Sequence, residues 1–167
     1  MILSVVILAL VTAQRLAELV VARRNTRRLL AEGGIERGAE HYPLMVALHA
    51  AWLGGLWILA WNRPANLWWL AVYLALEALR VWVLTSIGRR WTTRIIVVPG
   101  ETLVRRGPYR LIPHPNYAVV VGEIAVLPLV FGLTGYAVVF TVLNATMLWL
   151  RIRTENAALS EATAPQT

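Results

Sequence analysis

The chain alternates between long apolar segments and short polar connectors. Apolar residues dominate 1–21, 44–61, 67–87, 116–130 and 136–150. The first three segments are each about the twenty residues needed to cross a bilayer, while the last two are shorter, roughly 22 Å of helix each. Gly132-Leu133-Thr134-Gly135 separates these two segments, so they are predicted to form a helical hairpin. The pattern predicts an all-α integral membrane protein with about five transmembrane helices.

The polar connectors divide the charge unevenly between the two sides of the membrane. All 16 basic residues are arginine, and the connectors at 23–40, at 88–112 and after residue 150 hold nearly all of them, whereas the opposite side has Arg63 alone. Arginine-rich connectors remain in the cytoplasm. We therefore expect a protein of the cell (inner) membrane, with its amino terminus outside and its carboxyl terminus cytoplasmic. The arginines cluster between apolar runs, which favours membrane orientation over nucleic-acid binding despite a net charge of +7.

The length of 167 residues suits one domain. Residues 1–87 are predicted to be a membrane scaffold of three spans, 88–160 a cofactor-binding catalytic region, and 161–167 a short frayed tail. Within the long connector, 94–104 combines a β-rich run, the turn Pro99-Gly100 and a second apolar run, which predicts a small cytoplasmic hairpin. Cysteine and lysine are absent, which excludes disulfides, thiolate sites and Schiff-base chemistry.

Two pairs of opposite charges lie inside apolar segments. Arg15 and Glu18 are three residues apart, as are Glu77 and Arg80, so each pair shares a helix face. Ion pairs that pack the bundle are favoured over catalytic groups, although ionisable residues within a membrane are also functional candidates. His41 and His49 would lie about 12 Å apart along a helix, too far to share a metal, and no metal site is predicted.

The polar chemistry concentrates in Arg105–Tyr117 and on the last helix. Pro115 disfavours helical dihedrals at His114, which is therefore expected at a helix entrance, where free backbone N–H groups can meet a ligand. Asn144, Arg151 and Glu155 recur on one face of the last helix, and Asn116 and Glu123 share a face of the preceding one. A helical hairpin would make these two faces opposite walls of a polar pocket. These residues alone indicate a membrane enzyme or ligand-binding protein that acts on an amphiphile.

Two motifs add a resemblance. Gly107-Pro108-Tyr109-Arg110-Leu111-Ile112-Pro113-His114-Pro115-Asn116-Tyr117, followed by Arg151-Ile152-Arg153-Thr154-Glu155, resembles the isoprenylcysteine carboxyl methyltransferase family, whose pattern is G-P-Y-x-x-x-R-H-P-x-Y and then R-x-x-x-E-E. Pro113 stands where the family usually has arginine or lysine, and Asn156 where it often has a second glutamate. The segments 14–19, 22–25, 38–43 and 88–94 look like a short bacterial branch of the family. Members of this branch O-methylate alkylpyrones and are associated with type III polyketide synthases.

The resemblance implies an enzyme that transfers a methyl group from S-adenosylmethionine. By family likeness, the cofactor would be bound on the cytoplasmic side by Tyr109, Arg110, His114, Asn116, Tyr117 and Glu155. Arg151 would act on the anionic oxygen or on the cofactor carboxylate, and Glu123 would either hold a helix partner or take a proton. The expected substrate is lipid-like, most simply a long-chain alkylpyrone or related polyketide entering from the bilayer, which implies contact with membrane lipids and a functional link to a type III polyketide synthase.

Two alternatives stay open. One is a membrane NADPH-dependent reductase, because such enzymes have a similar helical architecture. The other is a small transporter or scaffold subunit, in which Arg15, Glu18, Glu77 and Arg80 would form a pathway or assembly contacts.

Overall fold

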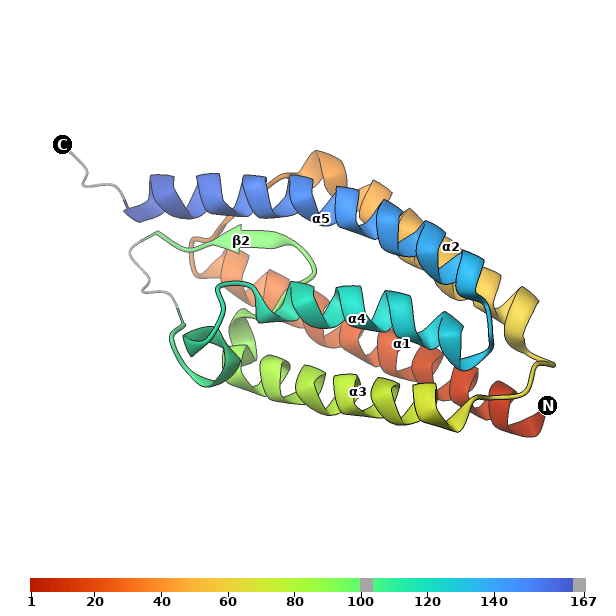
Figure 1. Cartoon of the computed structure of the whole chain (residues 1–167). Helices are drawn as coiled ribbons and strands as arrows, with labels where there is room; N and C mark the ends of the chain where they lie inside the picture. The colour runs from red at the N-terminus through yellow and green to blue at the C-terminus, as the bar shows by residue number, and fades with distance from the viewer. Residues whose placement is uncertain (100–103, 164–167) are drawn as a thin grey trace.

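The computed structural model describes residues 1–99 and 104–163, with side chains up to residue 158. Its long helices form a bundle (Figure 1): α1 (Ile2–Ala31), α2 (Tyr42–Ala60), α3 (Leu67–Ile87), α4 (Pro115–Val130) and α5 (Thr134–Thr163). Short elements lie between them: β1 (Ile35–Arg37), η1 (Ala39–His41), η2 (Gly88–Arg90), β2 (Ile95–Val97) and η3 (Gly107–Arg110). The frayed tail predicted from residue 161 is helical up to Thr163, and residues 164–167 lie outside the described part.

Four stretches are long and apolar enough to cross a membrane: Ile2–Ala31, Ala39–Ala60, Leu67–Arg90 and Thr134–Ala158. The helix α4 has 16 residues, about 24 Å, and is shorter than a full span. Large apolar side chains point outward, with Ile58 and Trp68 75% and 72% exposed, which a lipid environment explains. The chain is therefore a multi-pass membrane protein with four candidate spans among its described residues, where the sequence had predicted about five.

The connections at one end of the bundle are short and well capped. In the α2–α3 turn, the Asn66 Oδ1 atom accepts hydrogen bonds from the backbone N–H groups of Trp68 and Trp69 at 3.0 and 3.2 Å. The Asn66 N–H group donates to the Val130 carbonyl at 2.7 Å, which ties this turn to the end of α4. A short turn with Gly132 at φ +69° then leads into α5, which packs against both α4 and α2. The opposite end of the bundle carries η3 and β2 (Figure 1).

A buried network of five charged side chains joins α1, α3 and α4. The Glu123 Oε2 atom, on a side chain only 2% exposed, accepts hydrogen bonds from Arg15 Nη2 at 2.8 Å and from Arg80 Nη1 at 2.6 Å. The predicted Arg15–Glu18 ion pair is present at 3.0 Å. The predicted Glu77–Arg80 pair is replaced by contacts between helices: Arg80 binds Glu18 at 2.6 Å, and Glu77 lies 3.6 Å from Arg15. Partners on α1 and α4 can surround the Arg80 guanidinium, so it turns away from its own helix.

The first strand of the hairpin predicted within 94–104 is present as β2, and its partner among the described residues is β1. The strand β2 pairs with β1 in antiparallel register, with Ile35, Glu36 and Arg37 opposite Val97, Ile96 and Ile95. Residues 100–103, which would have formed the tip and second strand of that hairpin, lie outside the described residues. Because β1 belongs to the α1–α2 connector, this pairing brings the amino-terminal part of the chain to the end of the bundle that carries η3.

Candidate functional site

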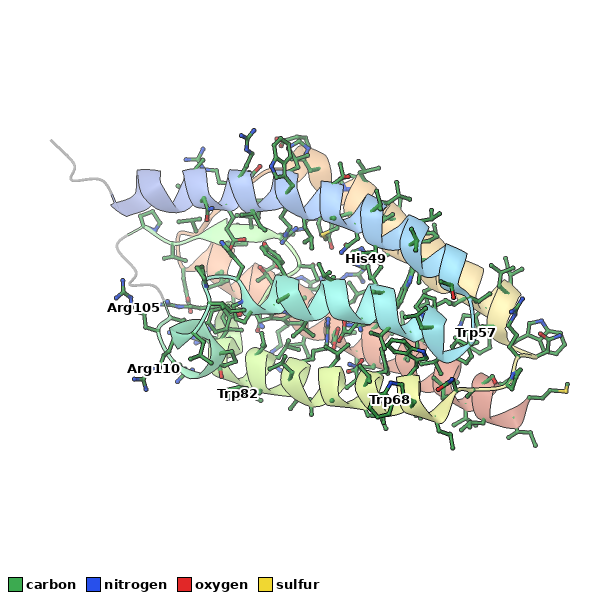
Figure 2. All side chains as sticks on the ribbon, in the orientation of Figure 1. His49, Trp57, Trp68, Trp82, Arg105 and Arg110 are labelled. Carbon is green, nitrogen blue, oxygen red and sulfur yellow. The ribbon has the colours of Figure 1, made fainter. Side chains whose placement is uncertain are left out.

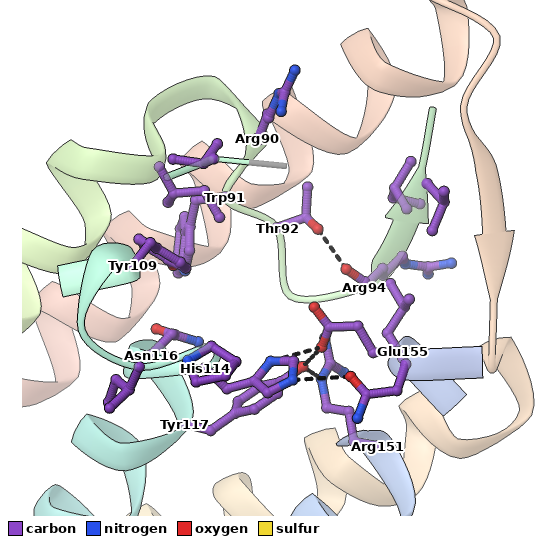
Figure 3. Close-up of a pocket in the computed structure, with 18 of the residues that line it drawn as sticks. Arg90, Trp91, Thr92, Arg94, Tyr109, His114, Asn116, Tyr117, Arg151 and Glu155 are labelled. Atoms are coloured by element: carbon purple, nitrogen blue, oxygen red, sulfur yellow. Dashed lines mark hydrogen bonds and ion pairs between the residues drawn. The ribbon is translucent and has the colours of Figure 1, made fainter. Parts of the chain in front are cut away.

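A cavity of about 750 Å³ opens at the η3 end of the bundle (Figure 3). Part of its polar lining comes from η3 and from the cavity-facing ends of α4 and α5: Tyr109, Arg110, His114, Asn116, Tyr117, Arg151, Glu155 and Asn156. The connector before η3 adds Arg90, Thr92, Arg94 and Arg105. Its apolar lining includes Leu29, Ile87, Ile95, Ile96, Val97, Val98, Val104, Leu111 and Ile112. This volume is in the range of cavities that hold cofactors or drug-sized ligands.

The local sequence explains why His114 lies at the entrance of α4. Pro113 and Pro115 flank it, and its backbone (φ −128°, ψ 62°) is that of the residue preceding the helix, with Pro115 in the first turn. Proline suits a first helical turn because the amide hydrogen that it lacks would have no partner there. The His114 ring then stacks on the Tyr117 ring, with centroids 5.3 Å apart and planes inclined by 21°. The imidazole is thus held in a fixed orientation at the cavity wall.

Side chains of α4 and α5 are connected across the cavity by one chain of hydrogen bonds (Figure 3). Arg151 Nε donates to the Tyr117 hydroxyl oxygen at 2.9 Å, and this hydroxyl donates to Glu155 Oε2. The same carboxylate oxygen lies 3.9 Å from His114 Nδ1, and the other ring nitrogen, Nε2, is 3.1 Å from Asn156 Oδ1. These groups satisfy one another's hydrogen bonds, so a polar ligand that binds them would replace some of these bonds with its own.

One polar atom at the cavity wall has no partner. Asn116 Oδ1 is buried and accepts no hydrogen bond among the described residues. Buried polar atoms are nearly always paired, and an unpaired one on a cavity wall is a natural acceptor for a ligand amino or hydroxyl group. Together with the Glu155 carboxylate, it gives this side of the cavity two acceptors for ligand donors.

The cavity lining is strongly basic. Five arginines contribute to it, Arg90, Arg94, Arg105, Arg110 and Arg151, against the single carboxylate of Glu155 among the described lining residues. Figure 2 shows Arg105 and Arg110 projecting from the η3 end of the molecule. The positive electrostatic potential of these arginines favours anionic ligands. Burial, reinforced by the negative charge of Glu155, raises the pKa of Tyr109 to about 12, so Tyr109 presents a neutral hydroxyl to the cavity.

The structure brings together most of the residues that the sequence singled out. Tyr109, Arg110, His114, Asn116, Tyr117, Arg151 and Glu155 all line the cavity. Glu123 does not, because the arginines of α1 and α3 draw its carboxylate into the bundle. Asn144 is not at the cavity wall either: it is 1% exposed and lies about two helical turns before Arg151 on α5. The predicted pocket wall therefore ends at the first turn of α4 and the last turns of α5.

Sequence reasoning missed the apolar wall and the partner of His114. The strand β2 was predicted to lie in a separate hairpin, yet it forms a side of the cavity. Asn156 was noted only as a departure from a motif, whereas its amide contacts His114. Met45 was missed as well, and its Sδ atom lies 3.2 Å from Arg151 Nη1. The segment 88–94 resembles the family branch but had no assigned role, and it leads directly into β2. It was the one feature of the sequence that could have indicated the apolar wall.

Comparisons with known proteins identify the family of this chain. A model of the isoprenylcysteine carboxyl methyltransferase family matches residues 69–161, which include both motifs at the cavity. The uncharacterized protein YpbQ of Bacillus subtilis (strain 168) is 41% identical over 160 residues, 93% of this chain and 95% of YpbQ. An uncharacterized protein of Haemophilus influenzae (strain ATCC 51907 / DSM 11121 / KW20 / Rd) is 25% identical over 159 residues, 91% and 92% of the two chains. No solved structure matches the chain. The chain belongs to the isoprenylcysteine carboxyl methyltransferase family.

Proposed function

We propose that this protein is an O-methyltransferase that uses S-adenosylmethionine to methylate an acidic hydroxyl or carboxyl group of a lipid-like molecule, most simply a long-chain alkylpyrone. The observation that carries the proposal is that the His114–Tyr117 turn and the Arg151–Asn156 helix end, both within the segment matched by the family model, line one cavity. Family membership supports methyl transfer at a membrane, and the basic, half-apolar lining supports an anionic amphiphile as the acceptor.

The residues present fit the proposed cofactor. Glu155 and the unpaired Asn116 Oδ1 atom would accept hydrogen bonds from its amino and hydroxyl groups. Arg110 would pair with its carboxylate, and the stacked rings of His114 and Tyr117 offer a flat surface for its purine. Tyr109, whose hydroxyl stays neutral, would contribute a further hydrogen bond. When bound, S-adenosylmethionine supplies an electrophilic methyl group on a sulfonium.

The residues of the chain then need to align the acceptor with the methyl group and to neutralise the charge of the acceptor oxygen. Arg151 is held by Tyr117 and by Met45, and its guanidinium would stabilise the anionic oxygen of the acceptor. The apolar walls would exclude water and hold the acceptor in line with the methyl group. Glu123 has no place in this scheme, because its carboxylate is occupied by Arg15 and Arg80 inside the bundle.

We also propose that the cavity end of the bundle faces the cytoplasm, with the carboxyl terminus on that side. The support is the distribution of arginine: the connectors on this side hold nearly all of them, and Arg63 stands alone at the opposite end. A cytoplasmic cavity would have direct access to a soluble cofactor, while its acceptor would arrive from the lipid phase.

Cofactor binding to the detergent-solubilised protein tests the site assignment. Glu155→Gln and His114→Ala are each expected to weaken binding of S-adenosylmethionine at least about tenfold in calorimetry, about 1.4 kcal/mol. Glu40→Gln and His41→Ala are matched controls. The His41 Nε2 and Glu40 Oε1 atoms are 3.3 Å apart, and neither residue lines the cavity. Wild-type affinity in both site variants would contradict the assignment, and thermal stabilisation by NADPH alone would favour a reductase.

The acceptor requires its own experiment. Membranes containing the protein are incubated with methyl-labelled S-adenosylmethionine and a 4-hydroxy-2-pyrone bearing a long alkyl chain, and the lipids are then extracted. We expect the label on the pyrone. If another lipid carries the label instead, methyl transfer stands and the acceptor proposed here is wrong.

A further inference from the structure

The two halves of the cavity differ in chemistry. The half that holds His114, Asn116, Tyr117 and Glu155 is formed by η3, α4 and α5, which carry the two family motifs. The more apolar half includes β2 with the adjoining Val98, together with Leu29 from the end of α1 and Ile87 from the end of α3; Thr92 and Arg94, next to β2, also belong to the lining. A cofactor rich in polar groups matches the first half, which leaves the apolar half for the hydrocarbon part of an acceptor.

The strand β2 cannot hold this position by itself. It has three residues and a single partner strand, β1, of the same length. A sheet of two such strands has no independent stability in water. The position of the wall therefore depends on side-chain contacts made by the segment around β2.

The strand β2 packs against α5 and against α1, and its side-chain hydrogen bonds come from the amino-terminal part of the chain. Glu36 on β1 accepts hydrogen bonds from Arg94 Nη1 with both carboxylate oxygens, at 2.8 and 2.9 Å. The Arg94 guanidinium lies over the Tyr42 ring, 4.4 Å from its centroid, and the Tyr42 hydroxyl is 3.1 Å from Thr93 Oγ1. We call Glu36, Tyr42 and Arg94 the clamp.

A further contact reinforces the clamp from α1. Asn25 Nδ2 donates to the Trp91 carbonyl at 2.8 Å. Asn25, Glu36 and Tyr42 all precede residue 69, where the match to the family model begins. The parts of the chain that fix the apolar wall are thus different from the parts that carry the family motifs.

The clamp also determines what Arg94 can do. Its hydrogen bond to Glu36 raises the pKa of Arg94 and occupies its charge, although Arg94 lines the cavity. A paired guanidinium that also stacks on an aromatic ring is more strongly held than a simple surface ion pair. Arg94 therefore acts as a support for the wall and not as a free cation for the ligand.

We infer that β2 is the acceptor-side wall of the cavity and that Glu36, through Arg94, is a positioning residue for acceptor binding. This inference rests on the proposed methyltransferase function and assigns the substrate chain to an apolar surface that the family motifs do not contain. Loosening the clamp would displace the wall that contacts the acceptor chain and leave the polar half, on α4 and α5, in place.

The test compares Glu36→Gln with Glu32→Gln. Both variants remove one carboxylate from the same connector, but Glu32 forms an exposed pair with Arg28, whereas Glu36 pairs with Arg94 in the clamp. For Glu36→Gln we expect the KM for a long-chain 4-hydroxy-2-pyrone to rise about tenfold. The kcat and the calorimetric Kd for S-adenosylmethionine should stay within about twofold of wild type. Glu36→Asp, which keeps the charge, should recover part of the loss.

Hydrogen–deuterium exchange of residues 91–98 in detergent gives a readout that needs no methyl transfer. We expect faster exchange in Glu36→Gln than in wild type and Glu32→Gln. Unchanged exchange together with an unchanged acceptor KM would overturn the inference, and so would a loss of cofactor affinity equal to the loss of acceptor affinity. If wild type transfers no methyl group while exchange still responds to Glu36→Gln, the proposed function fails and the clamp is supported.

Discussion

Replacing Glu123 by alanine tests whether this carboxylate is structural. Its Oε2 atom receives hydrogen bonds from Arg15 at 2.8 Å and from Arg80 at 2.6 Å, and the side chain is only 2% exposed. Breaking a buried ion pair by removing one partner costs about 3–5 kcal/mol. Arg15 and Arg80 both retain contacts to Glu18, so we expect the lower end, about 3 kcal/mol. For a chain of this size that corresponds to a fall in Tm of about 6–12 °C.

Glu123→Gln separates charge from shape. Glu123 Oε1 is buried without a hydrogen-bond partner, so an amide nitrogen at that position would displace no existing contact, and the amide oxygen could still accept from both arginines. We therefore expect a smaller loss than for alanine, about 1 kcal/mol. Thermal unfolding in detergent, followed by tryptophan fluorescence, measures both variants against Glu32→Ala, an exposed pair worth less than about 1 kcal/mol.

Cofactor binding decides between a structural and a catalytic Glu123. Because this side chain lies away from the cavity lining, Glu123→Gln should bind S-adenosylmethionine with wild-type affinity and should retain methyl transfer. A variant with an unchanged Tm that had lost activity would refute the structural assignment and favour the proton-accepting role, the other of the two roles expected from the sequence.

Two further predictions concern a loop glycine and a tyrosine. Gly38 has φ +62°, and a Cβ atom there would lie 2.9 Å from Thr154 Cγ2. We therefore expect Gly38→Ala to lower the free energy of unfolding by about 1–2 kcal/mol. Gly54 lies on a helix with open space around it, so Gly54→Ala should be neutral or slightly stabilising in the same thermal assay. The pKa of Tyr109 is raised from 10.0 to about 12, so its contribution to stability is complete below pH 10 and is lost as the pH rises toward 12. The Tm of Tyr109→Phe should therefore fall less than that of wild type between these pH values, and an identical fall would show that Tyr109 ionises normally.

The lengths of the apolar segments and the positions of the prolines were sufficient to predict the helices and the location of His114. Apolar segment length predicted the helical bundle, and the Pro113–Pro115 pattern predicted His114 at a helix entrance. The direction of Glu123 could not be predicted in the same way, because a helical repeat places it on the face of Asn116 but does not reveal that Arg15 and Arg80 lie nearby on other helices. Local turn chemistry at Pro99-Gly100 likewise favoured a hairpin, whereas the partner of β2 comes from about sixty residues earlier in the chain.

The way α5 is attached has a consequence for ligand binding. Near its start, the Tyr136 hydroxyl donates to the Trp52 carbonyl at 2.8 Å, and Gly55 leaves room for this ring, because an added Cβ there would collide with the Tyr136 hydroxyl. Near its end, α5 is attached to α4 through Arg151, Tyr117 and Glu155, the groups proposed to hold the ligand. A ligand that takes over these hydrogen bonds must therefore replace part of the attachment between α4 and α5, while the Tyr136 contact keeps the start of α5 attached to α2. Cofactor binding and the packing of the last two helices are thus expected to be coupled.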